Sequence, residues 1–521
     1  MTAAHRRRRS ALPGRDRRAV LHRAGAGTAR AQGQRVVVIG GGIAGISAAM
    51  VLAERGVAVT LVEREDSWGG RARSWTLPDG RSMSRGFHAF FRQYYTLRAL
   101  IGRADPGAAS LRSIGDYPLQ LQGGPRDSFA RIPRTPPWSV AAFALTSPSF
   151  PLRQLARVNL SAAIGLLTPD FPAAFSHLDG VSAQEYLDRL RFPDDARHLA
   201  LEVFARSFFA DPRDFSAGEL LGMFHTYFLG SAEGLVFDVP TDAYSMCLWG
   251  PLVSVPRRHG ADARLATTVR SVHSDPDRVR VRITGSSAAG TGPVHGAEEF
   301  LTADAVVVAA DPATSRQLLG AGVSDQPGWA AWSERLGRHR NAPPFAVWRL
   351  WLDRSVAAAA PAFLGTSGYG PLDNVSVLER FEATARRWHD RHGGSVIELH
   401  AYALPERTDE HALRRQLWEQ LLRLHPELAG AGAVHQEWLL RQDCPLIDTG
   451  PWRDRPEVTT PDPRIVLAGD WLRTDEPVAL MERAALTGLQ AANRLLEGWG
   501  VAGEDWWSVP LHGLMGRRSH P

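Results

Sequence analysis

Short apolar runs and amphipathic stretches alternate near the start of the chain. Residues 36–39 form a β-branched run that is typical of a buried parallel strand. The pattern then predicts a helix over residues 43–55 and a second strand over residues 58–63. Strand, helix and strand in this order predict a βαβ unit with parallel strands.

The regular pattern stops after residue 75 and returns in the second half of the chain. Residues 130–235 mix proline-punctuated loops with aromatic stretches, which predict helices at 199–209 and 219–229. Later helices are predicted at 410–424 and 477–496, the last with Asp475 as its N-cap and Pro477 in its first turn. Further strands are predicted at residues 262–272, 278–283, 303–310, 345–351, 395–402, 434–440 and 464–468.

The composition fits an ordered protein with two interleaved domains. The 521 residues are too many for one simple core, and 44% of them are hydrophobic and 22% charged. No run approaches the ~20 apolar residues that a membrane-spanning helix needs. The two cysteines, Cys247 and Cys444, exclude a disulfide framework and a cysteine-rich metal site. We therefore expect a reducing, cytosolic setting and no metal site.

Positive charge is concentrated at the amino terminus. Residues 1–35 hold ten arginines against Asp16, a balance of +9, so the rest of this +5 chain carries about 5 − 9 = −4. Such a tail is a disordered extension, a nucleic-acid arm or a tether to an anionic membrane. The acidic body argues against nucleic acid as a partner, and the tail lacks the apolar core of a signal peptide. All sixty basic residues are arginine, which excludes a lysine Schiff base.

A glycine-rich motif joins the first predicted strand to the first helix, since residues 40–45 read GGGIAG. Gly40 permits a tight turn, Gly42 lets the backbone approach a pyrophosphate, and Gly45 lets the helix pack on the strand. Glu63 ends the second strand, 21 residues after Gly42 (63 − 42), where a carboxylate can bind ribose hydroxyls. Together these features predict a dinucleotide site.

A second glycine motif follows in the next loop, where residues 69–74 read GGRARS. This GGRxxS pattern resembles the flavin-dependent amine oxidase and phytoene desaturase superfamily. The resemblance implies non-covalently bound FAD, with Arg71 on the pyrophosphate. The sequence VLAGD at 466–470 resembles the closing flavin motif of the same superfamily. There Asp470 is expected to bind ribityl or phosphate oxygens, and the amide near Met481 to face the flavin pyrimidine.

The resemblance also assigns a role to the segment GFHAFFRQYY at residues 86–95. Its aromatic residues have helical spacing, which predicts a buried helical face, and His88 lies off that face. In the superfamily this segment lines the flavin, so His88 is the first candidate for a catalytic base. The residues expected to bind FAD are Gly40, Gly42, Ala44, Gly45, Glu63, Arg64, Gly69, Gly70, Arg71, Gly86, Phe87, His88, Val269, Gly469, Asp470 and Met481.

Three segments narrow the resemblance to one group of enzymes. GFHAFFRQYY, RSFFADP at residues 206–212 and GLVFDVP at residues 234–240 resemble the actinobacterial isorenieratene synthases, which are carotenoid desaturase/methyltransferases. The resemblance implies β-carotene as substrate, with hydride abstraction and a 1,2-methyl shift that make the β-ring aromatic. Two prolines within residues 250–260 depart from the helix expected there.

Other interpretations stay open at this stage. A linear, phytoene-type desaturase carries the same FAD motifs, and so does a non-catalytic flavin or carotenoid binder. An amine oxidase is disfavoured because its usual flavin-side lysine has no counterpart. Weaker candidates are Asp211, Glu233 and Asp238 for the base, Phe208, Phe209, Tyr227 and Phe228 for cation stabilisation, and Cys444 for covalent flavin attachment.

A carotenoid substrate predicts contact with a membrane surface, because carotene resides in lipid. Residues 138–150, 171–175 and 506–514 carry aromatic and apolar side chains suited to the interface. We therefore expect a cytoplasmic protein, peripheral on the membrane, that passes electrons to an acceptor the sequence does not identify.

These inferences combine into an α/β fold with a Rossmann-type FAD-binding domain in three chain segments and an inserted mixed α+β substrate domain. The FAD domain is expected at residues 35–130, 241–335 and 446–500, and the substrate domain at 131–240 and 336–445. A disordered basic tail at 1–34 and a tail at 501–521 flank them, so order is expected to begin at Arg35.

Overall fold

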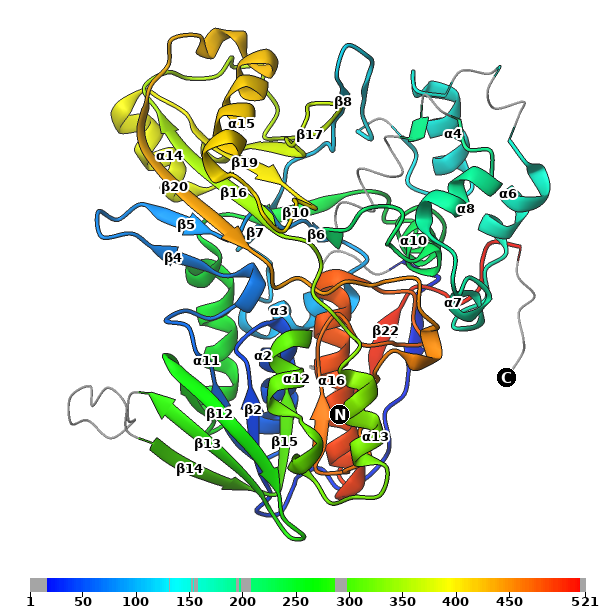
Figure 1. Cartoon of the computed structure of the whole chain (residues 1–521), viewed down its shortest axis with the longest axis vertical. Helices are drawn as coiled ribbons and strands as arrows, with labels where there is room; N and C mark the ends of the chain where they lie inside the picture. Colours follow the sequence, from blue (N-terminus) through cyan, green and yellow to red (C-terminus); the bar gives the residue numbers. More distant parts are fainter. Residues whose placement is uncertain are drawn as a thin grey trace.

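The computed structural model describes residues 16–130, 132–150, 153, 158–193, 196–197, 208–285 and 298–515. A parallel sheet with its helices forms the lower part of Figure 1, and a larger mixed sheet lies above it with a group of helices beside it. The parallel sheet and its helices confirm the predicted α/β class with a Rossmann-type domain.

The lower sheet has five parallel strands in the order β11, β3, β2, β15 and β21. Buried valines and isoleucines fill its central strands, as expected for a parallel sheet that is covered by other elements. Their bounds are Asp262–Arg264 (β11), Ala58–Val62 (β3), Arg35–Ile39 (β2), Ala305–Val308 (β15) and Ile465–Leu467 (β21).

Helices α2 (Ile43–Glu54) and α16 (Leu480–Gly498) pack side by side on this sheet. A Cβ on Gly488 would lie 2.1 Å from the Ala44 carbonyl oxygen, so only glycine permits this approach. Further helices of this part are α3 (Tyr95–Ala104), α11 (Gly250–Arg258), α12 (Pro312–Leu318) and α13 (Trp329–Leu336).

A three-stranded antiparallel sheet flanks the lower sheet and consists of β12 (Thr267–Ser274), β13 (Val279–Gly285) and β14 (Glu298–Ala303). The single strand predicted at 262–272 is wrong, because β11 and β12 belong to different sheets. Ala266 between them has a φ of 49°, and this left-handed residue turns the chain from one sheet to the other.

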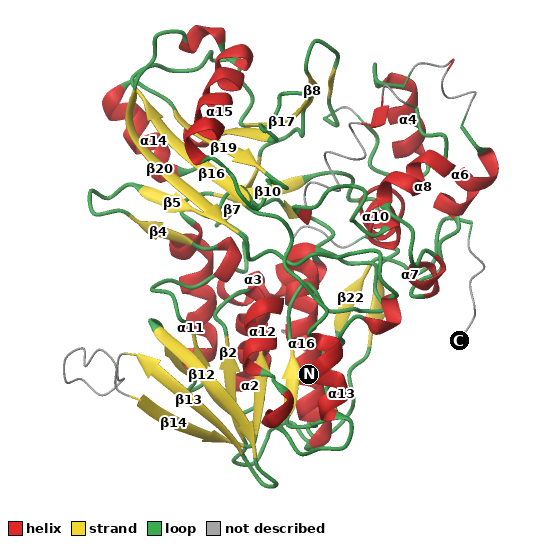
Figure 2. Cartoon of the chain, viewed as in Figure 1, coloured by secondary structure: helices red, strands yellow, loops and turns green. Residues whose placement is uncertain are grey.

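The upper sheet has seven strands in the order β20, β16, β19, β18, β17, β8 and β9. Helix α15 (Glu410–Leu424) packs on one face of it, as Figure 2 shows, and α14 (Ala383–His392) packs against its inner strands β16 and β19. Because β8 and β9 join this sheet, the domain boundary expected at residue 130 is too late. The bounds are Ala433–Arg441 (β20), Phe345–Leu352 (β16), Val396–Ala401 (β19), Asn374–Val377 (β18), Phe363–Ser367 (β17), Leu119–Leu121 (β8) and Arg126–Asp127 (β9).

The group of helices beside the upper sheet includes the predicted helix at 219–229, which is confirmed as α10 and the following π-helical turn His225–Leu229. Most of the helix predicted at 199–209 lies outside the described residues. Phe171 and Phe175 are buried against Trp452, so the membrane contact expected at 171–175 is wrong. The helices are α4 (Trp138–Thr146), α6 (Leu160–Leu167), α7 (Ala173–His177), α8 (Ala183–Arg189) and α10 (Ala217–Phe224).

The two ends of the described chain meet. Strand β1 (Val20–His22) pairs antiparallel with β22 (Trp506–Ser508), and the His22 ring stacks on Trp506. Ordered structure therefore begins before Arg35, contrary to the expectation of a disordered tail up to residue 34. The apolar residues of both short strands explain this, because each strand supplies the partner that the other lacks.

Three local expectations are corrected by tertiary contacts. Residues 87–95 are not one helix: β6 (Phe90–Phe91) pairs with β10 (Phe237–Pro240), and α3 begins only at Tyr95. The last helix begins at Leu480 with Ala479 as its N-cap. Asp475 and Pro477 therefore lie before the helix, and not at its N-cap and in its first turn. Residues 250–258 do form helix α11: Pro251 lies in its first turn, where proline is tolerated, and Pro256 lies inside the helix.

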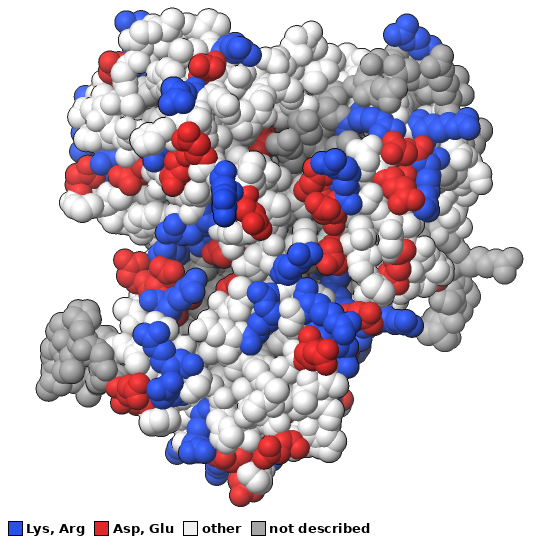
Figure 3. Space-filling view, viewed as in Figure 1, with Lys and Arg blue, Asp and Glu red and all other residues white. Residues whose placement is uncertain are grey.

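No helix within the described residues is long and apolar enough to cross a membrane. On the face shown in Figure 3, arginine and acidic side chains are interspersed over most of the described surface. The remaining small strands are β4 (Ser74–Thr76), β5 (Ser82–Ser84) and β7 (Leu111–Ser113).

Candidate active site

A cavity of about 570 Å³ is lined by residues from both larger sheets. The residues predicted to bind FAD line it, with two exceptions. Gly45 lies behind the wall, where a Cβ would come 1.8 Å from the Gly40 oxygen, so this glycine serves packing. Gly86 also lies outside the lining of the cavity, and its carbonyl oxygen accepts hydrogen bonds from His88 and Tyr244.

The glycine motif leaves open space where the chain meets the cavity. Gly40 has a φ of 106°, and a Cβ there would lie 2.3 Å from the Ala309 oxygen, which makes it a turn residue. A Cβ on Gly42 would meet only the Gly70 Cα, at 3.7 Å. Helix α2 has no side-chain cap at Gly42, so its first N–H groups are available to an anion.

The Glu63 carboxylate is fixed beside this motif. It accepts hydrogen bonds from the Gly41 N–H at 2.7 Å and from the Glu65 N–H at 2.9 Å. Burial raises the pKa of Glu63, whereas the two N–H groups act to lower it. Arg64 extends outward beside it and pairs with Glu65 at 3.4 Å. The carboxylate is thus positioned to accept hydroxyl hydrogens, as the ribose role requires.

Arg71 and Asp470 come from opposite ends of the chain and meet at the cavity wall. Two guanidinium nitrogens of Arg71 lie 3.0 and 2.5 Å from the Asp470 oxygens. This two-point pair fixes the orientation of the guanidinium. The pair joins the two motifs that resemble flavin-binding sequences, and Met481 and Val269 also line this cavity.

His88 lies on the loop before β6, partly exposed to the cavity. Its Nδ1 donates to the Gly86 carbonyl oxygen at 2.8 Å, which leaves Nε2 as the unprotonated nitrogen. Burial lowers the pKa of His88 to about 4, and the nearby Arg85 acts in the same direction. The imidazole is therefore neutral near pH 7 and can accept a proton.

The weaker candidates for the base lie elsewhere. Asp211, Glu233 and Asp238 are absent from the described lining of the cavity. Asp238 is buried in an ion pair with Arg98 at 2.5 Å, and Asp211 pairs with Arg213 at 2.8 Å.

Cys444 does line the cavity, and burial raises the pKa of its thiol to about 12. A protonated thiol is a poor nucleophile, which argues against covalent attachment of a flavin through this residue. Among the described residues, no group of three or more His, Cys, Asp or Glu side chains is arranged to hold a metal ion.

The half of the cavity under the upper sheet is rich in aromatic rings. Of the rings predicted to stabilise a cation, Phe209 and Tyr227 line this cavity, whereas Phe208 packs in the core and Phe228 lines a smaller neighbouring cavity. The aromatic residues of the wall are Phe87, Phe91, Tyr94, Tyr117, Phe209, Tyr227, Phe345, Phe363 and Tyr402.

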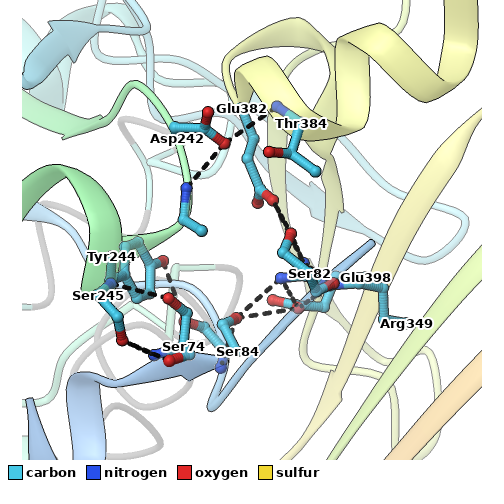
Figure 4. Close-up of polar contacts among 12 residues, drawn as sticks. Ser74, Ser82, Ser84, Asp242, Tyr244, Ser245, Arg349, Glu382, Thr384 and Glu398 are labelled. Atoms are coloured by element: carbon cyan, nitrogen blue, oxygen red, sulfur yellow. Dashed lines mark hydrogen bonds and ion pairs between the residues drawn. The ribbon is translucent and has the colours of Figure 1, made fainter. Parts of the chain in front are cut away.

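A polar row on strand β19 was missed by the sequence interpretation. Glu398, His400 and Tyr402 occupy every second position at the end of the predicted strand, so they share one side of the sheet. Arg349 pairs with Glu398 on the neighbouring strand, as Figure 4 shows. The signal that could have revealed this row is the alternation itself, because Glu398, His400 and Tyr402 repeat at every second position of the predicted strand and the residues between them are apolar.

The chain has clear relatives among known proteins. Residues 43–496 match the model of the flavin containing amine oxidoreductases, and residues 4–74 that of the pyridine nucleotide-disulphide oxidoreductases. The chain is 52% identical to the carotenoid phi-ring synthase of Streptomyces griseus over 96% of its own length and 95% of that protein. It is 26% identical to the carotenoid phi-ring synthase of Chlorobaculum tepidum, covering 92% and 91%.

A likeness to solved structures supports the same fold. Cyclohexylamine oxidase from Brevibacterium oxydans superposes with a TM-score of 0.62 at 14% identity, covering 90% of this chain and 99% of that one. At this identity the likeness concerns the fold alone.

Proposed function

This chain belongs to the flavin-containing amine oxidoreductases and is an FAD-dependent oxidoreductase, and we propose that it converts the β-rings of β-carotene into aromatic rings, as an isorenieratene synthase does. The observation that carries this proposal is the 52% identity to a carotenoid phi-ring synthase over nearly the whole chain. The cavity supports it, because the glycine motifs and the aromatic wall enclose one continuous space.

The residues at the cavity suit FAD. The open space at Gly42 and the uncapped start of α2 would hold the phosphates, together with Arg71, and Glu63 would hold the ribose. Asp470 and the N–H of Met481 would hold the ribityl chain and the pyrimidine edge. When bound, FAD supplies the hydride acceptor for the ring carbon.

The protein's own groups account for the remaining chemistry. Loss of a hydride leaves a ring cation, and migration of a methyl group from C1 to C2 removes the quaternary carbon that blocks aromaticity. No methyl donor is required, because the methyl group stays in the molecule. Aromatic faces such as Phe209 and Tyr227 stabilise the cation without reacting with it. His88 accepts a proton through Nε2, and the electrons leave to an external acceptor such as a quinone or dioxygen.

The product made from labelled β-carotene tests the proposal. We expect cells that produce β-carotene and express this chain to accumulate a carotenoid with aromatic end rings, which product mass and absorption identify. Carotene labelled at a C1 methyl should yield a ring that retains the label at C2. Loss of the label would exclude the methyl shift, and a more desaturated polyene with intact β-rings would establish a linear desaturase instead.

We also propose that helix α4 contacts the membrane from which the substrate is taken. Trp138 and Leu145 are 68% and 70% exposed and, seven residues apart, lie on one face of the helix with Ala141. Ile164 on α6 and Met515 are further exposed apolar side chains of this end of the molecule. Tryptophan beside aliphatic side chains suits the membrane–water interface.

Sedimentation with anionic vesicles tests this surface. The double variant Trp138→Ser/Leu145→Ser should bind at least about tenfold more weakly, since burial of such side chains contributes about 1.5–3 kcal/mol each. Phe300→Ser is the matched control, because Phe300 is 62% exposed on β14, at the far end of the molecule in Figure 1. Equal binding by both variants would exclude α4 as the docking surface.

A further inference from the structure

The two faces of strand β19 have opposite character. Ile397, Leu399 and Ala401 face the apolar core beneath helix α15. The alternate residues Glu398 and His400 are each about 1% exposed and lie on the other face, followed by Tyr402 just beyond the strand. Because a buried charge or imidazole is unfavourable without partners, this polar face needs a compensating arrangement.

Arg349 supplies that compensation. Its Nε and Nη2 atoms lie 2.9 and 2.7 Å from Oε2 of Glu398, and Ser84 donates to the same oxygen at 3.3 Å (Figure 4). The pKa of Glu398 is about 2: burial acts to raise it, but Arg349 and then His400 outweigh that effect. Burial raises the pKa of neighbouring Glu382, which accepts a hydrogen bond from Ser82. Of these two carboxyl groups, Glu398 is therefore the ionised one, and its Oε1 can accept a hydrogen bond from a further donor.

The ionised carboxylate decides the tautomer of His400. A carboxylate accepts only, so Nε2 of His400, 2.9 Å from Oε1 of Glu398, carries the proton; the Phe87 N–H also faces Nε2 but from 3.4 Å, which is a much weaker contact. In the neutral imidazole, Nδ1 then has the lone pair and accepts from the Tyr402 hydroxyl at 2.7 Å. Asn374 donates to the Tyr402 oxygen at 3.0 Å. Hydrogen bonds thus run in one direction, from Tyr402 through His400 to Glu398.

This chain of hydrogen bonds ends at the cavity. Tyr402 is partly exposed there, and its ring packs edge-on against Phe209 with centroids 4.8 Å apart. Phe209 in turn packs against Phe345, at 4.8 Å. The Tyr402 hydroxyl is therefore a polar group within the aromatic wall that would surround a carotenoid ring.

We propose that Tyr402, His400 and Glu398 form a second proton acceptor of the cavity, in addition to His88, and that Tyr402 is the catalytic residue that touches the substrate ring. This rests on the proposed function, in which two dehydrogenations release two protons from each ring. A ring C–H bond breaks, and its electron pair forms the ring double bond and neutralises the cation. The proton adds to the Tyr402 oxygen while the hydroxyl proton of Tyr402 moves to Nδ1 of His400. The resulting imidazolium is stabilised by Glu398, and the proton returns by the same route to water after the product leaves.

The reaction of the FAD-loaded enzyme with β-carotene provides the first test. Tyr402→Phe keeps the ring but removes the hydroxyl, and should lower aromatic product about 100-fold. The rate at which β-carotene bleaches the flavin without oxygen should stay within about twofold of that of the unsubstituted enzyme. A carotenoid whose ring has undergone only one of the two dehydrogenations should accumulate. Tyr186→Phe, which removes a half-buried hydroxyl on α8 outside the lining of the cavity, should keep the ratio of aromatic product to bleached flavin. Unchanged aromatisation by Tyr402→Phe would overturn the proposal.

A second measurement needs no substrate. In the FAD-loaded protein with ¹⁵N-labelled histidine, the His400 signals, assigned through His400→Gln, should show a protonated Nε2 and an unprotonated Nδ1. The Nδ1 shift should change in Tyr402→Phe. A proton on Nδ1 would overturn the relay. If β-carotene fails to bleach the flavin of the unsubstituted enzyme, the proposed function fails, and this measurement still decides whether the relay exists.

Discussion

Gly42→Val should give a folded protein that no longer retains FAD. A Cβ at this position meets only the Gly70 Cα at 3.7 Å, so a side chain can start here without a clash with the protein. The side chain would instead occupy the space where the pyrophosphate must approach the backbone. We expect affinity for FAD to fall at least about 100-fold, or about 2.7 kcal/mol, by fluorescence titration of the apoprotein.

Two other glycines make this result specific. Gly320→Val adds the same side chain where no atom lies within 4 Å and should leave FAD content unchanged. Gly45→Val places a Cβ 1.8 Å from the Gly40 oxygen and should lower the melting temperature as well as the FAD content. Full FAD occupancy in Gly42→Val would show that this loop does not hold the cofactor.

His88→Ala should keep FAD bound and lower aromatic product about 100-fold, the usual contribution of a general base. The pKa of His88 is lowered to about 4, so its neutral, proton-accepting form persists from pH 8 down to about pH 5. Product formation that depends on His88 should therefore be level over this range and fall as the pH drops through about 4.

His435→Ala is the matched control, because this histidine is exposed on the edge strand β20. It should leave both product and FAD content unchanged. If His88→Ala retains full aromatisation, His88 serves only through its hydrogen bond to Gly86, and the relay of Tyr402 and His400 must remove both protons.

The cofactor half of the cavity was predictable because contiguous residues build it. The run from Arg35 to Gly45 encodes a strand, a turn and a helix in direct succession, and Glu63 follows one strand later. Helix α15 likewise has the predicted bounds, 410–424, since its N-cap Asp409 accepts hydrogen bonds from the first turn. In such segments, local sequence and final structure agree.

The substrate half depends on contacts between distant segments. Strands β8 and β9 are only three and two residues long, and they exist because β8 pairs with β17. Phe90 and Phe91 belong to an aromatic set with helical spacing, but in the structure they form a strand that pairs with β10. His400 approaches His88 only because β19 is held between β16 and β18. No local pattern contains such pairings, so sequence interpretation failed where the sheet partners were remote.

The parallel sheet also sets the order of events during synthesis. Its strand β15 lies between β2, near the start of the chain, and β21, at residues 465–467. The helix that packs across α2 follows later still, and β22 is needed to pair β1. A nascent chain on the ribosome therefore cannot complete the Rossmann-type domain until almost all of it has emerged, and the early strands must wait with their pairing edges open. Ribosome-stalled or carboxyl-terminally truncated chains should thus bind chaperones and lack flavin. Only complete chains should show the yellow colour of bound flavin.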